Sequence, residues 1–378
     1  MPTILFLSKA PPYRHTGAEQ VVWNVGTHLA ANGWNVHFLC PEGDDPPDVE
    51  NITYHHLSTP DSFFAEKATF FLKGIPAYRR VRSAIQPDLV YDNASPFPFL
   101  YAYAADSDRL ITKVHAVYGL SAFQNKDHPI TQIGTIVGEQ MYRLVDGSNI
   151  LTISESTKER LSGLVRKNAG EVTVVTNGID TERFEYAFSP DGPVLSLCEL
   201  TPRKNVEMLL RAWKIVETRT VVERELIIAG DGPQREYLEG LANELTLSTV
   251  SFVGYVSESE KHDLFEEAFC YVLPTRMEGF GLTNLEAMAS GCVVVSTDVP
   301  GVRDYLIDGE NGYTVPSDDS QALAERLSSV LNAPEEQRRI AKSGHQTAER
   351  YDISDAAEAE RKVLTEKMAA RAGKQKRL

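Results

Sequence analysis

Apolar runs of strand length alternate with helix-like patterns along nearly the whole chain. This alternation predicts parallel β-sheets whose strands are joined by helices, which is an α/β class of fold. The stretch 18–31, for example, places on one face of a helix the residues Val21, Val22, Val25 and Leu29. We expect strands near 3–7, 35–40, 88–91, 110–114, 150–153 and 172–175 in the first half, and near 193–198, 225–229, 250–253, 270–273, 292–296 and 313–315 in the second.

The length of 378 residues suits two domains of similar size. A polar stretch between Asp180 and Pro193 separates the two sets of strands, and the last helical stretch, about 354–370, has no strand after it. Two doubly wound domains that face each other would bind ligands at the carboxyl ends of their strands, in the cleft between them. We predict a Rossmann-like domain over 1–184, a linker over 185–192 and a second Rossmann-like domain over 193–350. We expect the final helix, with a basic tail over 351–378, to return to the N-terminal domain.

The composition is that of a globular protein, with 42% apolar and 24% charged residues. The net charge of −15 argues against nucleic acid as a partner, because such binding needs a basic surface. No apolar run approaches the roughly 20 residues of a membrane span, and no signal peptide is expected. We predict a cytoplasmic protein with buried, unpaired thiols, because strand-like apolar runs hold the widely spaced Cys40, Cys198, Cys270 and Cys292.

Two basic stretches stand out against this acidity. Residues 63–85 combine several lysines and arginines with aromatic side chains and a single acid, Glu66, and residues 367–378 are basic without any acid. The ordinary interpretation is a solvated helix face and a frayed tail. The alternative is peripheral contact with anionic lipid headgroups, which gives ~1 kcal/mol for each basic residue near the surface.

The most informative motif lies between Glu278 and Glu286. It follows an apolar run, 271–274, that predicts a buried strand, and it opens a helix that we expect to end at Gly291 with a left-handed cap. One carboxylate is thus expected before the turn and the other in the first helical turn. Glycines between them let backbone N–H groups approach a ligand, and a helix N-terminus attracts anions. The site offers donors to phosphate and acceptors to hydroxyl groups, and a sugar nucleotide carries both.

Shorter patterns are individually weak. Gly17 follows the first strand and indicates either a plain turn or a backbone approach to phosphate. His115 ends an apolar strand, where a lone histidine is more often structural than catalytic. Arg203 and Lys204 follow the strand near 193–198 and are either surface charges or cations that neutralise a diphosphate.

Three further patterns are ordinary turns and loops when each is taken alone. Asn177–Asp180 and Gly230–Pro233 have turn composition. Asp106-Ser107-Asp108 has the Asp-x-Asp shape that binds metal in some sugar-nucleotide enzymes. Because it lies in a polar loop before a strand, we interpret it as coincidental.

Taken together and in order, these patterns resemble the family 4 retaining glycosyltransferases, whose fold is GT-B. The resemblance covers most of the chain, and the glutamate pair with its Gly-Phe-Gly is the most specific part. The residues that carry it are Gly17, His115, Ile153–Thr157, Asn177–Phe184, Thr201–Asn205, Gly230–Pro233, Val253–Val256 and Glu278–Glu286.

The resemblance implies a role for each matching position. Glu286 would hold the ribose hydroxyls, Glu278 would accept from hydroxyls of the donor sugar, and Lys204 would bind the diphosphate. Residues 280–282 would offer backbone N–H groups, residues 254–256 would lie beside the base, and His115 would sit by the transferred sugar. The implied catalytic residues are His115, Lys204 and Glu278, and the implied donor-binding residues are Gly17, Arg203, Lys204, Gly254, Tyr255, Val256, Glu278, Gly279, Phe280, Gly281, Leu282 and Glu286.

The implied chemistry transfers a sugar from a nucleoside diphosphate to a hydroxyl of a glycan, a lipid-linked or a small-molecule acceptor, with retained configuration. No metal or other cofactor is expected. The departing phosphate can take the proton of the acceptor hydroxyl, so no carboxylate need act as nucleophile. The main demand on the protein is then to stabilise charge on the diphosphate, where losing one donor costs about 10²–10³ in rate.

One position departs from the family pattern. Where the family usually has an arginine before the lysine, this chain has Glu199. A carboxylate about 4 Å from a phosphate would cost roughly 4 kcal/mol at an effective dielectric of 20. Either Glu199 turns away and Arg203 supplies the second cation, or Glu199 binds a hydroxyl of an unusual donor, or the chain no longer catalyses. We favour the first interpretation because Arg203 stands beside Lys204.

Two alternatives to the transferase therefore remain open. One is a non-catalytic partner protein that binds sugar nucleotides, and it rests on Glu199. The other is a GT-B-fold sugar-nucleotide epimerase, which the Glu278–Glu286 pattern suits less well. The donor base, the sugar and the acceptor are not fixed by the sequence.

Overall fold

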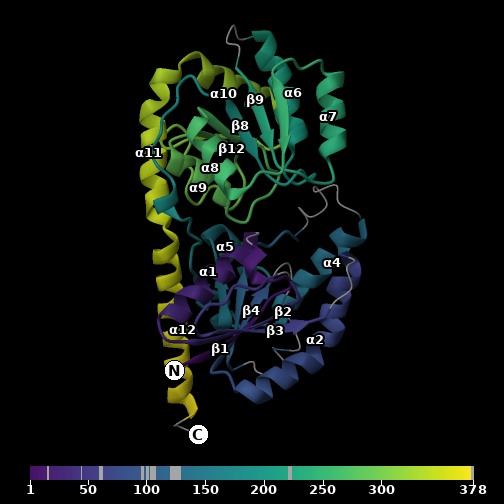
Figure 1. Ribbon diagram of the computed structural model, residues 1–378, viewed down its shortest axis with the longest axis vertical. Helices are drawn as coiled ribbons and strands as arrows, with labels where there is room; N and C mark the ends of the chain where they lie inside the picture. Colours follow the sequence, from purple (N-terminus) through teal and green to yellow (C-terminus); the bar gives the residue numbers. More distant parts are fainter. Residues whose placement is uncertain are drawn as a thin grey trace. The chain divides into compact units, whose positions relative to one another are not determined.

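The computed structural model describes residues 1–14, 17–43, 45–58, 63–94, 98, 102, 108–119, 129–219 and 224–375. Contacts divide the chain into two compact units, each built on a parallel sheet with helices (Figure 1). The first unit comprises Met1–Val117, Thr135–Gly178 and Ile353–Leu378, and the second comprises Tyr118–Gly134 and Ile179–Asp352. Two Rossmann-like α/β domains are therefore present, as the alternating pattern predicts.

The first unit holds a seven-stranded parallel sheet in the order β3-β2-β1-β4-β5-β6-β7. The order reverses between β1 and β4, and such a switch point opens a crevice at the carboxyl ends of the strands. The edge strand β3 was not predicted. Its sequence Ile-Thr-Tyr-His-His-Leu is half polar and does not have the apolar pattern of a buried strand. The strands are β1 (Thr3–Leu7), β2 (Asn35–Pro41), β3 (Ile52–Leu57), β4 (Leu89–Ala94), β5 (Leu110–Val114), β6 (Ile150–Thr152) and β7 (Thr173–Val174).

Helices cover both faces of this sheet. Alternate residues of each strand point to opposite faces. Phe6 and Phe38 pack with residues of α1 and α12, whereas Leu7 and Leu39 pack with residues of α2. The helices that follow these strands in the chain are α1 (Gly17–Ala31), α2 (Phe63–Ile85), α4 (Pro129–Glu139), α5 (Glu155–Ser162) and the final α12 (Ile353–Gln375).

The final helix α12 returns to the first unit and is tied to its sheet by a buried ion pair. Lys113 Nζ on β5 lies 2.8 Å from Glu360 Oε2 on α12, and the two side chains are 1% and 2% exposed. Tyr91 on β4 donates its hydroxyl to the same carboxylate, and Lys113 also donates to the carbonyl of Val175 at 3.1 Å. The apolar Leu364 packs in the core beside these groups. The predicted return of the C-terminal helix is confirmed.

The second unit holds a six-stranded parallel sheet in the order β10-β9-β8-β11-β12-β13. Its switch point lies between β8 and β11, so the segments that follow these two strands meet at one crevice. The strands are β8 (Val194–Leu197), β9 (Leu226–Ala229), β10 (Val250–Gly254), β11 (Cys270–Leu273), β12 (Val293–Thr297) and β13 (Tyr313–Val315). The helices are α6 (Val206–Arg219), α7 (Arg235–Glu244), α8 (Glu258–Glu267), α9 (Leu282–Ser290), α10 (Ser320–Asn332) and α11 (Arg338–Ala348).

The chain passes between the units at Val117–Tyr118, Gly134–Thr135, Gly178–Ile179 and Asp352–Ile353. Residues 185–192, which the polar composition predicts as a linker, belong to the second unit. The N–H of Ala187 donates to the carbonyl of Ser290 at 2.9 Å, and a side chain on Gly192 would clash with the carbonyl of Glu267. All four cysteines are buried and unpaired, as predicted.

Candidate active site

The crevice of the second unit brings together Lys204 and Glu278. Lys204 follows β8 and Glu278 follows β11, the two strands that flank the switch point. Lys204 Nζ lies 2.6 Å from Glu278 Oε2, and the two side chains are 12% and 13% exposed. Burial raises the pKa of the Glu278 carboxyl, but the charges of Lys204 and Arg203 outweigh it and hold that pKa below its usual value. Glu278 is therefore an ionised acceptor near neutral pH.

Arg203 is the second cation at this carboxylate. Its Nη1 lies 3.5 Å from Glu278 Oε2 and donates to the carbonyl of Met277 at 3.1 Å. Glu199 is exposed, and no ion pair joins its carboxylate to Lys204 or Arg203. An exposed Glu199 and an Arg203 beside the Glu278 carboxylate are compatible with the first interpretation of the unusual glutamate.

The turn between the two glutamates presents a helix N-terminus. Gly281 has a φ of +83° and caps α9, and a side chain there would collide with the hydroxyl of Tyr305. Phe280 is 3% exposed and packs its ring against Tyr305 and Tyr351, so its side chain faces the core. The N–H of Asn284 donates to the carbonyl of Gly281 at 2.9 Å, and the N–H groups of Leu282 and Thr283 precede it at the start of α9, where an anion can accept from them.

Glu286 lies further along α9 than the sequence indicates. The helix begins at Leu282, so Glu286 falls beyond the first turn, and the prediction of a first-turn position was wrong because the glycines delay the start of the helix. Lys261 Nζ on α8 lies 3.0 Å from Glu286 Oε1 and 2.9 Å from Glu258 Oε2. The second oxygen, Glu286 Oε2, is buried and accepts no hydrogen bond from the part of the chain that the structure describes.

Burial and Lys261 act against each other on this glutamate. Burial raises the pKa of Glu286, and the charge of Lys261 lowers it, with the net result above the usual value. Lys261 was missed at the sequence level. The signal that could have placed it is the pattern Ser257-x-x-Glu260, because this pair forms a capping box at the start of α8 and sets Lys261 in its first turn.

The segment predicted to lie beside the base follows an edge of the same sheet. Gly254 ends β10 with a φ of +79°, and its carbonyl accepts from the N–H of Gly230 at 2.7 Å. A side chain at Gly254 would meet the guanidinium of Arg235. Tyr255 is 83% exposed, and Val256 follows it before the cap of α8. An exposed aromatic ring such as that of Tyr255 can stack on a planar group.

His115 and Gly17 belong to the first unit, so they are described apart from Lys204 and Glu278. His115 directly follows β5, is 7% exposed, and its Nε2 lies 2.6 Å from Asn93 Oδ1. Burial, and then the nearby charges of Lys113 and Lys9, lower its pKa to about 3. The ring is neutral near pH 7 and donates to Asn93 from Nε2, which leaves Nδ1 as an acceptor. Gly17 begins α1 with a φ of +46°.

Other predicted features have these outcomes. Asp106 of the Asp-x-Asp pattern lies outside the described residues, and within the described ranges no group of three or more His, Cys, Asp or Glu side chains could hold a metal ion. None of the described helices is long and apolar enough to cross a membrane. In the basic tail, Lys367 donates to the carbonyl of Ser148 and Arg371 lies 3.2 Å from Asp108 Oδ2. These two tail residues are occupied within the first unit.

Comparison with known proteins agrees with the fold and with the motifs. The family described as glycosyl transferases group 1 matches residues 179–347, and the family described as Glycosyltransferase Family 4 matches residues 15–183. Together the two matches span residues 15–347, so the chain belongs to the group 1 and family 4 glycosyltransferases.

Individual relatives match most of the length of this chain. The chain is 27% identical to glycogen synthase of Mycobacterium tuberculosis over 366 residues, which cover 89% of this chain and 87% of the relative. Sucrose-phosphate synthase from Thermosynechococcus elongatus superimposes with a TM-score of 0.83 at 21% identity, over 98% of this chain and 100% of the other. HepE from Anabaena, solved with UDP-glucose, gives a TM-score of 0.74 at 17% identity over 98% and 100%. These solved structures establish the GT-B fold.

Proposed function

We propose that this chain transfers a hexose from a nucleoside diphosphate to an acceptor hydroxyl with retention of configuration. The observation that carries the proposal is the pairing of Lys204 and Arg203 with Glu278 beside the N-terminus of α9. This group combines cations and backbone donors for a diphosphate with a carboxylate acceptor for sugar hydroxyls. HepE from Anabaena, which shares the fold, was solved in complex with UDP-glucose, and this supports a nucleotide sugar as the donor class.

In the proposed reaction the bond from the anomeric carbon to the diphosphate oxygen breaks, and a bond to the acceptor oxygen forms on the same face. The acceptor proton passes to the departing phosphate oxygen. Lys204 has three N–H donors, so it can keep Glu278 and also hold a phosphate oxygen. Arg203 adds a second cation as charge develops on the diphosphate, which is the largest demand of the step. The neutral His115 would offer Nδ1 to the donor sugar or to positive charge near its anomeric carbon.

A direct test measures nucleoside diphosphate release from a panel of sugar nucleotides with glycan, lipid-linked and small-molecule acceptors. Thermal shift with the same donors comes first, because a ligand stabilises by RT ln(1 + [L]/Kd). Acceptor-dependent release is the expected result. Donor binding without release under every acceptor would favour the non-catalytic partner protein. The exposed position of Glu199 supports the transferase over that alternative.

Metal independence gives the first prediction. Arg203 and Lys204 supply the positive charge that a divalent ion supplies in other sugar-nucleotide enzymes, so treatment with EDTA is expected to change turnover by less than about twofold. The measurement is nucleoside diphosphate release before and after chelation, with added Mg²⁺ or Mn²⁺ as the control. A tenfold loss that either ion restores would contradict the proposal.

The role of Glu286 as acceptor for the ribose hydroxyls gives the second prediction. Lys261→Met removes the charge that opposes burial, so Glu286 should become protonated at higher pH and lose an acceptor. The donor KM rises as pH falls in both proteins, and the rise should begin at higher pH in the variant. At neutral pH we expect about a tenfold higher KM with little change in kcat, in line with the loss of a charged hydrogen bond.

The matched control for Lys261→Met is Glu258→Gln. It removes the exposed partner of Lys261, whose side chain is 60% exposed, and leaves the bond to Glu286 intact. Its KM should stay within about twofold of the wild type. Superimposable KM–pH curves for the wild type and Lys261→Met would refute the role given to Lys261.

Peripheral contact with anionic lipid is a further part of the proposal, restricted to residues 63–85 and the tail. On α2 the described Arg79 and Arg80 are exposed. The occupied Lys367 and Arg371 make the tail the weaker contributor. Co-sedimentation with vesicles that contain anionic lipid should exceed that with neutral vesicles and should fall with salt. Equal sedimentation with both kinds of vesicle would count against the contact.

A further inference from the structure

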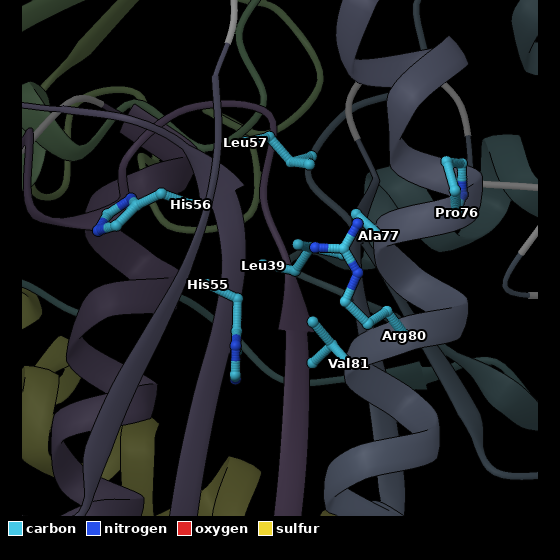
Figure 2. A pocket seen from close by; sticks show the side chains of 8 residues that line it. All are labelled: Leu39, His55, His56, Leu57, Pro76, Ala77, Arg80 and Val81. Carbon is cyan, nitrogen blue, oxygen red and sulfur yellow. The ribbon is translucent and has the colours of Figure 1, made fainter.

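A pocket of about 460 Å³ lies in the first unit between the strands β2 and β3 and the helix α2. Its volume lies in the range of small-molecule sites, roughly 300–1,000 Å³. Of the described residues that line it, none is acidic, although the chain carries a net charge of −15. Figure 2 shows these lining residues, which are Leu39, His55, His56, Leu57, Pro76, Ala77, Arg80 and Val81.

Among the described lining residues, Arg80 is the only arginine, lysine, aspartate or glutamate. Figure 2 shows its side chain extending from α2 across the pocket toward the strands. No hydrogen bond or ion pair joins its guanidinium to the described part of the chain. A guanidinium presents five N–H donors in a planar fork that fits the two oxygens of a phosphate or carboxylate.

His55 supplies a second donor on the opposite wall. Its Nε2 lies 3.2 Å from Nδ1 of His37, and the two rings stack with centroids 5.3 Å apart. Burial, and then the neighbouring His55, lower the pKa of His37 to about 4, and burial also lowers the pKa of His55. Both rings are neutral near pH 7. When His37 donates to His55 Nε2, the proton of His55 lies on Nδ1 and is available to a ligand.

Apart from His56, the remaining described residues that line the pocket are apolar. Leu39 and Leu57 come from the strands, and Pro76, Ala77 and Val81 come from α2. A bare inorganic ion would satisfy Arg80 but would leave these side chains against water. A ligand that also carries a hydrocarbon group would cover them and gain from the burial.

We propose that this pocket binds an anionic phosphate or carboxylate group attached to a small apolar segment, with Arg80 and His55 as its donors. The site uses residues of the first unit alone and does not depend on the proposed glycosyl transfer. It would hold the acidic end of an amphiphile, either a soluble phosphate monoester or a lipid headgroup of the same chemistry.

Isothermal titration of the full chain with hexyl phosphate, hexanoate, inorganic phosphate and 1-hexanol tests this site. The wild type should bind hexyl phosphate or hexanoate saturably, at least tenfold more tightly than inorganic phosphate and tenfold more tightly than 1-hexanol. Arg80→Gln should weaken the tighter ligand at least tenfold. Arg79→Gln, which changes the adjacent exposed arginine outside the pocket, should stay within twofold, and thermal melts should show both variants folded.

The outcomes separate the proposal from its alternatives. Absence of saturable binding by either anionic amphiphile would overturn it. Equal losses in Arg79→Gln and Arg80→Gln would also overturn it, because they would indicate general surface charge, and equal binding of 1-hexanol would leave no role for the anion. Displacement of hexyl phosphate by vesicles of phosphatidic acid, but not of phosphatidylcholine, would support the site with a lipid source. Binding without such displacement would support it with a soluble source.

Discussion

Replacement of Lys204 by alanine is expected to lower turnover at least a hundredfold. The ammonium lies 2.6 Å from Glu278 in the crevice that follows β8 and β11, where a diphosphate would also lie. Loss of one donor to charge that develops in a transition state costs about 10²–10³ in rate. The measurement is nucleoside diphosphate release at saturating donor and acceptor.

A measurement of the free energy of unfolding and a surface control variant show whether the loss of turnover in Lys204→Ala comes from the site itself. Glu278 keeps Arg203 as a partner in the variant, so the free energy of unfolding should fall by only about 1–3 kcal/mol. Lys214→Ala is the matched control, because that ammonium donates to the hydroxyl of Thr246 at the surface. Its turnover should match the wild type. Near-normal turnover of Lys204→Ala would remove the lysine from the proposed diphosphate site.

Arg203→Ala refines the same prediction. Because Arg203 shares the carboxylate of Glu278 and Glu199 stays exposed, we expect this variant to lose about tenfold or more in turnover. The double variant should lose less than the product of the two single effects, because the two cations act on one site. Full activity of Arg203→Ala would mean that the missing family arginine has no substitute here.

Replacement of Glu360 by glutamine is expected to destabilise the first unit by about 3–5 kcal/mol. Lys113 and Glu360 are almost fully buried, and removal of one charge leaves the other without compensation. Tyr91 would also lose the carboxylate that accepts its hydroxyl. Urea unfolding followed by circular dichroism measures the change, with a matching fall in the melting temperature.

A double variant and a control variant in α12 show whether the buried ion pair causes the loss of stability in Glu360→Gln. Lys113→Met combined with Glu360→Leu removes both charges, so it should recover a large part of the loss. Glu366→Gln changes an exposed glutamate of α12 and should stay within about 0.5 kcal/mol of the wild type. A Glu360→Gln variant as stable as the wild type would show that the ion pair does not anchor the return helix.

The sequence predicts the architecture well because the strands are short apolar runs. The parallel order then places the segments after β8 and β11 at one crevice, so Lys204 and Glu278 meet although 74 positions separate them. Their ion pair follows from the topology and not from any local pattern. The resemblance to the family supplied the role of each residue, which spacing alone could not.

Features that depend on contacts between distant segments could not be predicted in the same way. The edge strand β3 is half polar because one edge of a sheet tolerates histidines. Lys113 and Glu360 lie on separate elements, and nothing in their local sequences marks them as a buried pair. The position of Lys261 beside Glu286 depends on how α8 packs on α9, whereas sequence periodicity gives only the existence of each helix.

Proton NMR of the complete reaction tests the central claim most directly. The wild-type chain, a sugar nucleotide that stabilises it in thermal shift and its acceptor are followed until the donor is consumed. The anomeric signal of the new glycosidic bond should show the same configuration as the donor, with one nucleoside diphosphate released for each bond formed. A product of inverted configuration, or consumption of the donor without a new glycosidic bond, would contradict the account.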